Sequence, residues 1–371
     1  MQPARIGIDC RLGGLRHAGI GRYIVELVSR LVTDGSFSWV LFCTDQEQVT
    51  EILGNKPPSN VKVVLAPIPH YTVQEQLKMP RIFNKEQLDL LHIPHFNAPI
   101  LYTGPYVLTV HDLLWHEHRG AQVTTLSWYS YWFKYIAYRV ITRTAIYQAQ
   151  HICVPSQTVA QAVSNHYAFA KDKLTVTKEG IATALKSQVE LVKKLPRKQH
   201  HLLYVGSLYP HKNIARVIDA LHQLPKYHLT IVSSRSAFRD QVAASVSKQL
   251  RNRVSFIDAT SDAKLAQQYA TASALVQPSF SEGFGLTGLE AMAFNTPVIA
   301  SDIAIFREIY GSAALYFSPS FTPSLVKTIK QLEDTSTQQA VLKASKHVRA
   351  QYSWDETTQK TKAIFIQLLK K

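Results

Sequence analysis

The sequence predicts an α/β fold made of two doubly wound, Rossmann-like domains, and three observations lead to this prediction. Short apolar runs with β character alternate with amphipathic runs along the 371 residues, which is typical of βα units around parallel sheets. The alternation stops after Gly180, runs through a polar and basic stretch at residues 186–201, and resumes at Leu202. Near the end of the second series, a strand–loop–helix–strand unit carries two glutamates, as ligand-binding edges of such sheets often do. We therefore expect domains at residues 1–185 and 186–350, followed by a terminal helix within residues 351–371.

The expected elements follow from apolar periodicity. The strands of the first series are Ile6–Asp9, Trp39–Cys43, Val61–Leu65, Leu90–Ile93 and Val107–Val110. The strands of the second series are Leu202–Val205, His228–Val232, Val254–Ile257, Ala274–Gln277 and Pro297–Ala300. The expected helices are Gly21–Val32, Ala160–His166, Ile214–Leu221 and Trp354–Leu369.

The composition is that of an ordinary soluble protein, with 46% hydrophobic and 18% charged residues. No apolar run is long enough to span a bilayer, and the first residues read as a strand and not as a secretion signal. Cys10, Cys43 and Cys153 are odd in number, far apart and set among apolar residues. They predict buried thiols in a reducing compartment, and hence a cytoplasmic location.

The net charge of +15 is uneven, because residues 186–371 hold 24 of the 41 Lys and Arg residues. An anionic ligand, a membrane surface and nucleic acid are the partners that such a charge favours. A solvated basic surface explains the charge equally well.

The most informative stretch is Ser281–Asn295, reading SEGFGLTGLEAMAFN. Glu282 precedes a glycine loop, and Glu290 lies in the helical run that follows. Each glutamate alone could complement a helix dipole or face solvent. Together, one acid on the loop and one in the helix suit a ligand with hydroxyls at two places and phosphate between, because carboxylates accept hydroxyl hydrogen bonds and helix N-termini receive phosphate.

A second segment, Tyr204–Asn213, follows an expected strand and precedes an amphipathic run. Lys212 lies at this strand–helix junction, where an ammonium group can neutralise a diphosphate as a point charge. A surface lysine is the alternative interpretation.

These two segments resemble the donor-site motifs of family 4 retaining glycosyltransferases, the glycosyl transferases group 1 with the GT-B fold. The resemblance implies that Glu290 holds the ribose hydroxyls of a nucleotide sugar and that Glu282 contacts its sugar. Backbone amides of the glycine loop would approach the sugar and phosphate, and this loop comprises Gly283, Phe284, Gly285 and Leu286. Family members often have an arginine after the glycine of the second segment, whereas this chain has Ser207. His211 would then supply a donor, or the phosphate would depend more on Lys212.

The first loop contains Gly19 and Gly21. As a dinucleotide-binding fingerprint it is weak, because the third glycine is replaced by Ile24 and only Asp45 approximates the expected acid. It is similar to the first loop of the family, which lies near the diphosphate. A tight turn that needs glycine is compatible with both interpretations.

His111 ends the expected strand at Val107–Val110 and is similar to a family histidine that faces the donor sugar across the cleft. Asp112 would orient this loop. His95 and Asn97 follow another expected strand and are candidates for the acceptor side. His92, His95, His116 and His118 could suggest a metal site, but no cysteine cluster or HExxH pattern supports one, so we expect no metal.

The stretch Trp128–Tyr138 is rich in aromatic residues and is followed by Arg139 and Arg143. Such a stretch can bind an interface or stack on sugars, but it more often forms helix core, and we favour the core interpretation.

The resemblance covers nearly the whole chain, including Val154-Pro155-Ser156 and Tyr352-Ser353-Trp354. It implies two domains facing across a cleft, a final helix that crosses back to the first domain, and no cofactor. The implied reaction is metal-independent transfer of a hexose, mannose-like by resemblance, from GDP-mannose or a UDP-sugar with retention. The acceptor would be a saccharide or a polyprenyl-linked saccharide in cell-surface polysaccharide synthesis. An anionic inner membrane surface would be a further partner, and nucleic acid would not.

Three other classes remain open. One is a different GT-B enzyme, such as a nucleotide-sugar epimerase or a phosphorylase. Another is a redox Rossmann enzyme. The third is a basic membrane- or nucleic-acid-binding protein without catalysis.

Overall fold

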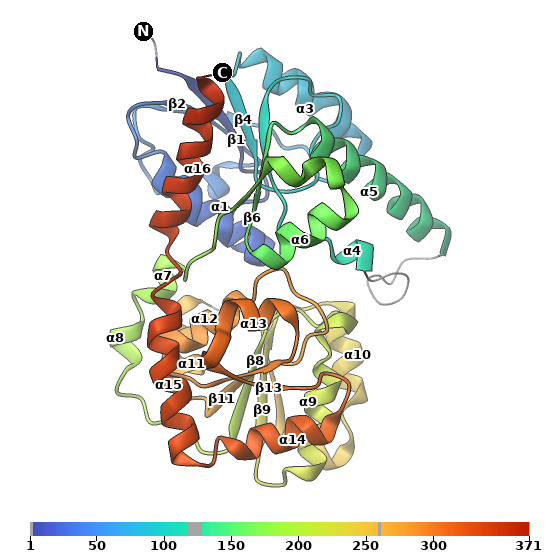
Figure 1. The fold of residues 1–371 in the computed structure, drawn as a ribbon, viewed down its shortest axis with the longest axis vertical. Coiled ribbons are helices and arrows are strands. Elements are labelled where there is room, and N and C mark those ends of the chain that lie inside the picture. Colours follow the sequence, from blue (N-terminus) through green and yellow to red (C-terminus); the bar gives the residue numbers. More distant parts are fainter. Residues whose placement is uncertain (1–2, 118–127, 259–260, 371) are drawn as a thin grey trace. The chain divides into compact units, whose positions relative to one another are not determined.

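The computed structural model describes residues 3–117, 128–258 and 261–370. The chain forms two compact units that divide between Glu179 and Gly180 (Figure 1). Among the described residues, unit 1 holds the chain up to Leu113, Trp128–Glu179, and the chain from Ser353 onward. Unit 2 holds Gly180–Tyr352 and the short helix α4 (Leu114–Glu117). The sequence placed the division a few residues later, after residue 185.

Unit 1 is built on a seven-stranded sheet with the order β3-β2-β1-β4-β5-β6-β7. All neighbouring strands are parallel, so their carboxyl ends share one edge. The strands are β1 Arg5–Asp9, β2 Ser38–Cys43, β3 Val61–Leu65, β4 Leu90–Ile93, β5 Tyr106–Thr109, β6 His151–Val154 and β7 Leu174–Val176. The helices are α1 Ala18–Leu31, α2 Gln46–Leu53, α3 Val73–Lys85, α5 Trp128–Gln148, α6 Gln157–His166 and α16 Trp354–Leu369.

Successive residues of β2 point to opposite faces of this sheet and build two cores. Val40 and Phe42 belong to the core beneath α3, α5 and α6, while Trp39 and Leu41 belong to the core beneath α1 and α16. The last helix therefore completes a core that the first strand begins.

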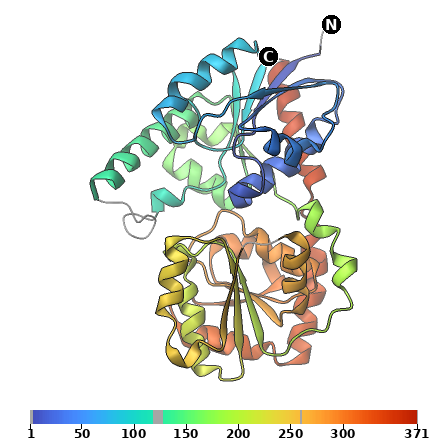
Figure 2. The same cartoon turned by 180° about the vertical axis from the view of Figure 1, so that it is seen from behind.

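Unit 2 is built on a six-stranded parallel sheet with the order β10-β9-β8-β11-β12-β13 (Figure 2). The strands are β8 His201–Val205, β9 His228–Ser233, β10 Val254–Asp258, β11 Ala274–Gln277, β12 Val298–Ser301 and β13 Ala314–Phe317. The helices are α7 Thr183–Lys186, α8 Val189–Val192, α9 Ile214–Ala220, α10 Ala237–Ser245, α11 Asp262–Thr271, α12 Leu286–Ala293, α13 Ala304–Tyr310, α14 Thr322–Gln331 and α15 Thr335–Arg349.

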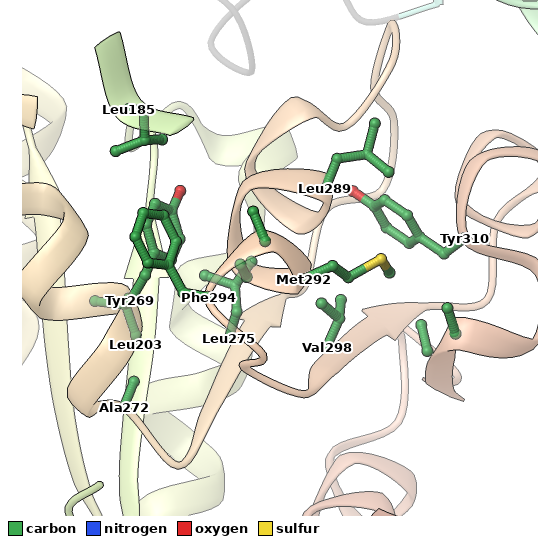
Figure 3. Packing of buried hydrophobic residues seen from close by; sticks show 14 of the residues in the cluster. Leu185, Leu203, Tyr269, Ala272, Leu275, Leu289, Met292, Phe294, Val298 and Tyr310 are labelled. Carbon is green, nitrogen blue, oxygen red and sulfur yellow. The ribbon is translucent and has the colours of Figure 1, made fainter. Parts of the chain in front are cut away.

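The core of unit 2 around α12 is close-packed. Tyr269 of α11 stacks on Phe294 with ring centroids 5.6 Å apart, and Tyr310 of α13 lies beside Leu289 and Met292 (Figure 3). This packing fixes the position of α12, the helix that carries Glu290.

The predicted α/β class is confirmed, and each strand expected from the sequence is present to within about a residue at its ends. The three cysteines are buried and free, as predicted. The short strands β6, β7 and β13 were not predicted. Among residues 3–117, 128–258 and 261–370, no helix is long and apolar enough to cross a membrane.

The core interpretation of Trp128–Tyr138 is correct only for one side of α5. One side of α5 is buried through Tyr131, Tyr135 and Tyr138. The other side exposes large apolar side chains, with Phe133 74% exposed and Ile136 60% exposed. The sequence could not reveal this, because a helix that is apolar all round has no periodicity to mark its buried side.

Candidate functional site

The principal polar cluster of unit 2 lies where β8 and β11 end. These strands are parallel neighbours in the sheet, so the segments that follow them meet at the same edge. The segment after β8 contains a single 3₁₀ turn, Pro210–Lys212, and then α9. The segment after β11 contains Glu282 and the glycine loop, and then α12.

Lys212 and Glu282 are paired across these two segments. The Lys212 Nζ atom lies 2.6 Å from Glu282 Oε2, and the two side chains are 15% and 17% exposed. Ser279 Oγ donates to the other carboxylate oxygen of Glu282 at 2.8 Å. The pair therefore brings one ammonium and one carboxylate, both still accessible, to the carboxyl edge of the sheet.

Backbone contacts hold the two segments together. The Phe280 amide donates to the His211 carbonyl oxygen at 2.8 Å. Asn213 Nδ2 donates to the Pro278 carbonyl oxygen at 2.9 Å, and Asn213 has the left-handed conformation that asparagine tolerates. His211 is buried, with its ring stacked on that of Tyr209. It lies beside the Lys212–Glu282 pair in sequence but is largely covered.

Glu290 lies on α12 and is only 4% exposed. Tyr269 donates its hydroxyl hydrogen to Glu290 Oε2 at 2.7 Å, which fixes the carboxylate. The N-cap residue of α12 is Gly285, which has no side chain to cap the first turn. The amides of that turn are therefore oriented toward the same edge as Lys212, as in anion sites at helix N-termini.

The glycine loop has its shape for a steric reason. Gly285 has φ +98°, and a Cβ atom there would lie 2.4 Å from the Tyr310 hydroxyl. That hydroxyl donates to Gln277 Oε1 at 2.6 Å and also contacts the Gly285 carbonyl oxygen. Phe284 turns its ring into the core against Tyr352, so only its backbone can face a ligand. Ser207 accepts the Tyr204 hydroxyl hydrogen through its carbonyl oxygen.

In unit 1, the segments after β4 and β5 bring three of the predicted residues to the carboxyl edge of the other sheet. His111 lies with Nε2 3.0 Å from the Pro94 carbonyl oxygen and Nδ1 3.3 Å from Glu179 Oε1. Burial by itself lowers the pKa of His111, but the hydrogen bond and charge of Glu179 outweigh it and raise the pKa above its ordinary value.

His95 and Asn97 lie in the segment that follows β4. The backbone amide of Asn97 donates to His95 Nδ1 at 3.2 Å, and the Tyr71 hydroxyl lies 3.3 Å from His95 Nε2. Burial and the neighbouring His111 and His70 hold the pKa of His95 well below its ordinary range, so this ring is neutral.

A buried ion network supports this segment, and sequence reasoning missed it. Arg11 is fully buried, with Nη2 2.7 Å from Asp9 Oδ2 and 2.9 Å from Glu75 Oε1. The other oxygen of Glu75 accepts from Asn97 Nδ2 at 2.7 Å and from the Tyr71 amide at 2.8 Å. The acidic Asp9 at the end of β1 and the basic Arg11 two residues later were a signal in the sequence. Glu75 could not be linked to them, because it is 64 residues away from Arg11.

The first-loop glycines differ from each other. Both lie in α1, which begins at Ala18. A Cβ atom on Gly21 would lie 1.9 Å from the Gly14 carbonyl oxygen, whereas one on Gly19 would meet nothing within 4 Å. Gly21 is therefore required by backbone packing, and Gly19 is not.

Among the residues that the structure describes, no group of three or more His, Cys, Asp and Glu side chains is placed to hold a metal ion. His92 is buried and donates to or accepts from Thr109 Oγ1 at 2.9 Å, and burial lowers its pKa to about 3. His118 lies outside the described residues.

Comparison with known proteins matches both halves of the chain. Residues 187–348 match the family model of glycosyl transferases group 1, and residues 17–185 match that of glycosyltransferase family 4. Together these matches include Lys212, Glu282 and Glu290 in the second half and His111 in the first.

Two curated relatives are mannosyltransferases by name. The O-antigen chain mannosyltransferase RfbU of Salmonella typhimurium is 28% identical over 300 residues, which is 80% of this chain and 78% of that protein. The O-antigen chain mannosyltransferase B of Escherichia coli is 31% identical over 170 residues, which is 44% of this chain and 45% of that protein.

The solved structure of WaaG, a glycosyltransferase involved in lipopolysaccharide biosynthesis, superposes with a TM-score of 0.72 at 16% identity. The superposition covers 97% of this chain and 99% of WaaG, and it confirms the GT-B class of fold. With both halves matched in order, the chain belongs to the group 1, family 4 glycosyltransferases.

Proposed function

We propose that this glycosyltransferase moves a mannose-like hexose from a nucleotide diphosphate sugar to an acceptor hydroxyl, with retention at the anomeric carbon. The observation that carries the proposal is the Lys212–Glu282 pair next to the glycine loop that begins α12, with Glu290 held on the same helix. The names of the two curated relatives favour mannose and O-antigen synthesis.

The charged groups of the site suit different parts of the donor. Lys212 and the amides of the glycine loop are the positive groups for the diphosphate. Glu282 is the acceptor of hydrogen bonds from the sugar hydroxyls, and Glu290 from the ribose hydroxyls. Ser207 and His211 lie in the same segment after β8 as Lys212, and we assign both to the neighbourhood of the diphosphate.

The transfer step in this proposal mainly requires stabilisation of the charge on the leaving diphosphate. As the bond between the anomeric carbon and the phosphate oxygen breaks, negative charge grows on the leaving diphosphate beside Lys212. The acceptor oxygen forms the new bond on the same face of the sugar, and its proton passes to the leaving phosphate. His111, His95 and Asn97 are proposed to face the sugar and the acceptor. No metal and no cofactor takes part in this scheme.

The test begins with thermal-shift screening of GDP-mannose and UDP-sugars against the purified chain. Release of the nucleoside diphosphate is then followed with and without a saccharide or polyprenyl-linked acceptor. The proposal predicts release only when acceptor is present, unchanged by EDTA, and an α-linked product from an α-linked donor by NMR. Donor conversion without acceptor would indicate an epimerase instead, and loss of activity in EDTA would overturn the metal-free scheme.

Two variants test the role that the proposal gives to Lys212. Lys212→Ala should lower kcat about 100-fold or more, because it removes the cation beside the leaving group. Lys343→Ala, an exposed lysine of α15, is the matched control and should have no effect. Wild-type turnover in Lys212→Ala would remove Lys212 from the site.

A further inference from the structure

A cavity of about 430 Å³ lies in unit 2 at the amino edge of the sheet, where β8 and β11 begin. We call it the amino-edge pocket, and its lining includes Arg197, Lys198, His200, Ser273, Glu333 and Gln338 around an apolar base. The Lys212–Glu282 pair follows the opposite ends of β8 and β11. Since β8 has five residues at about 3.3 Å each, roughly 16 Å of sheet separates the pocket from that pair.

The base of the amino-edge pocket is apolar. Leu202, Ile299 and Ile329 line it and are buried in the core between the sheet and α14. Leu332 follows α14, at the turn that leads into α15 (Figure 1), and packs against the same core. The cavity volume lies in the range of small-molecule sites, about 300–1,000 Å³, and would hold about 14 waters at about 30 Å³ each. Because waters over an apolar base lack polar partners there, a hydrocarbon group is the better occupant.

Two cations of the pocket lack an acidic partner. Arg197 donates to the carbonyl oxygens of Ala272 at 2.8 Å and Asn295 at 3.0 Å, and these acceptors are uncharged. In the part of the chain that the structure describes, no carboxylate forms an ion pair with Arg197 or Lys198. Burial lowers the pKa of Arg197 below its ordinary value, so a negative group beside it would stabilise the cation.

Glu333, the acidic residue of the lining, already has partners. The Tyr227 hydroxyl donates to Glu333 Oε1 at 2.8 Å, and His200 Nε2 lies 4.0 Å from the same oxygen. His200 has φ +55°, a left-handed conformation that is uncommon outside glycine and is often found at binding sites. Its ring packs edge-on against that of Tyr227, with centroids 4.8 Å apart. The charge that is left without a partner in the pocket is therefore positive.

We propose that the amino-edge pocket binds a small amphipathic anion. Its hydrocarbon part lies on Leu202, Ile299 and Ile329, and its carboxylate, sulfonate or phosphate group lies beside Arg197 and Lys198. A neutral apolar molecule would leave the cations without a partner, and inorganic phosphate would leave the apolar base in water. The inference does not depend on the proposed transfer reaction, because the pocket lies at the edge of the sheet opposite the donor candidates.

The competing explanation is that the cations only cap helices. Arg197 donates to the C-cap residues of α11 and α12, Ala272 and Phe294, where a positive charge suits the helix dipole. The test therefore leaves Arg197 in place and changes Lys198 and Gln338, whose side chains form no hydrogen bond within the described residues. Q338E places an acid in the first turn of α15, where it is favourable for the helix.

The experiment is a fluorescence titration of the whole chain with 8-anilino-1-naphthalenesulfonate, an aromatic sulfonate that fluoresces once it leaves water. Saturating GDP and UDP are present throughout, to keep the probe from the donor edge. We expect one saturable site, from which octanoate displaces the probe at concentrations at least about tenfold lower than octanol needs. K198E/Q338E should raise the Kd of the probe about tenfold or more, because it makes the local charge beside the sulfonate negative.

The matched control is K343E/Q351E, which makes the same change of charge on exposed residues outside the pocket lining and should bind the probe as wild type does. Equal melting temperatures would show that the variants fold. The proposal is overturned if no saturable binding remains with GDP and UDP present, or if octanol competes as well as octanoate. It is also overturned if K198E/Q338E has the Kd of wild type.

Discussion

Gly19 and Gly21 lie two residues apart in the first turn of α1, and only one of them is required by packing. Gly21 approaches the Gly14 carbonyl oxygen so closely that a methyl group has no room, while the space at Gly19 is open. We predict that Gly21→Ala lowers the free energy of unfolding by about 1–3 kcal/mol, as overpacking does. Gly19→Ala should leave it unchanged or raise it by up to about 1 kcal/mol, because alanine favours a helix. Urea unfolding measures both.

The two glycine variants also distinguish an effect on packing from an effect on donor binding. If a donor phosphate comes close to the first turn of α1, Gly19→Ala should weaken donor binding without loss of stability. Equal stability losses in the two variants would contradict the packing argument.

His111 gives a pH-dependent test at the same scale. Its pKa is raised in the folded chain by Glu179 in spite of burial. A raised pKa means that the interaction stabilises the fold fully below the unfolded value near 6.5, and that this contribution is lost as the pH rises through the folded pKa. Glu179→Gln should therefore lower the His111 pKa in an NMR titration, and it should destabilise the chain more at acidic than at alkaline pH.

Glu47→Gln is the control for this titration, because Glu47 is an exposed partner of Arg16 in a different part of unit 1. A His111 titration that is the same in Glu179→Gln and in wild type would show that the pair does not set the pKa.

At the scale of elements, the last helix joins the first core of the chain. Phe365 of α16 is fully buried against Trp39 and His92, and the core it enters begins at Ile6 and Ile8 of β1. Lys362 of the same helix is paired with Asp34, and Arg30 of α1 with Asp355. Unit 1 therefore needs both ends of the chain.

We predict that Phe365→Ala lowers the free energy of unfolding of unit 1 by about 3–5 kcal/mol, the usual cost of deleting a buried aromatic ring. Gln367→Ala, on the exposed side of α16, should change it by less than about 0.5 kcal/mol. Urea unfolding of the two variants makes the comparison, and equal midpoints would show that α16 is not part of the core.

The elements also show where sequence reasoning stops. Strands such as Val61–Leu65 and Ala274–Gln277 were predicted with their observed ends, because their apolar runs are bounded by turn residues. The exposed side of α5 was missed, because both of its sides are apolar and only the tertiary structure shows which one is covered. The catalytic candidates Lys212 and Glu282 were found from local motifs, and their pairing follows from the adjacency of β8 and β11.

Contacts between residues far apart in sequence could not be predicted for the same reason. Tyr310 determines the glycine at 285 from 25 residues away, and Glu75 holds Asn97 and Arg11 from two other segments. No spacing rule joins such residues until the order of the strands is known.

At the scale of the whole molecule, each unit gathers a different set of polar groups at the carboxyl edge of its sheet. Unit 2 brings together the groups suited to a nucleotide diphosphate sugar, namely Lys212, Glu282, Glu290 and the start of α12. Unit 1 brings together neutral His95, His111 and Asn97 over a buried ion network.

The central claim is that the edge of unit 2 binds the donor, and isothermal titration with the nucleotide sugar that thermal-shift screening selects tests it most directly. We predict that Lys212→Ala and Glu290→Gln each raise the Kd about tenfold or more, since each removes a charge-assisted contact. Lys343→Ala should bind as wild type does. Unchanged Kd values in both site variants, with the fold intact, would contradict the account.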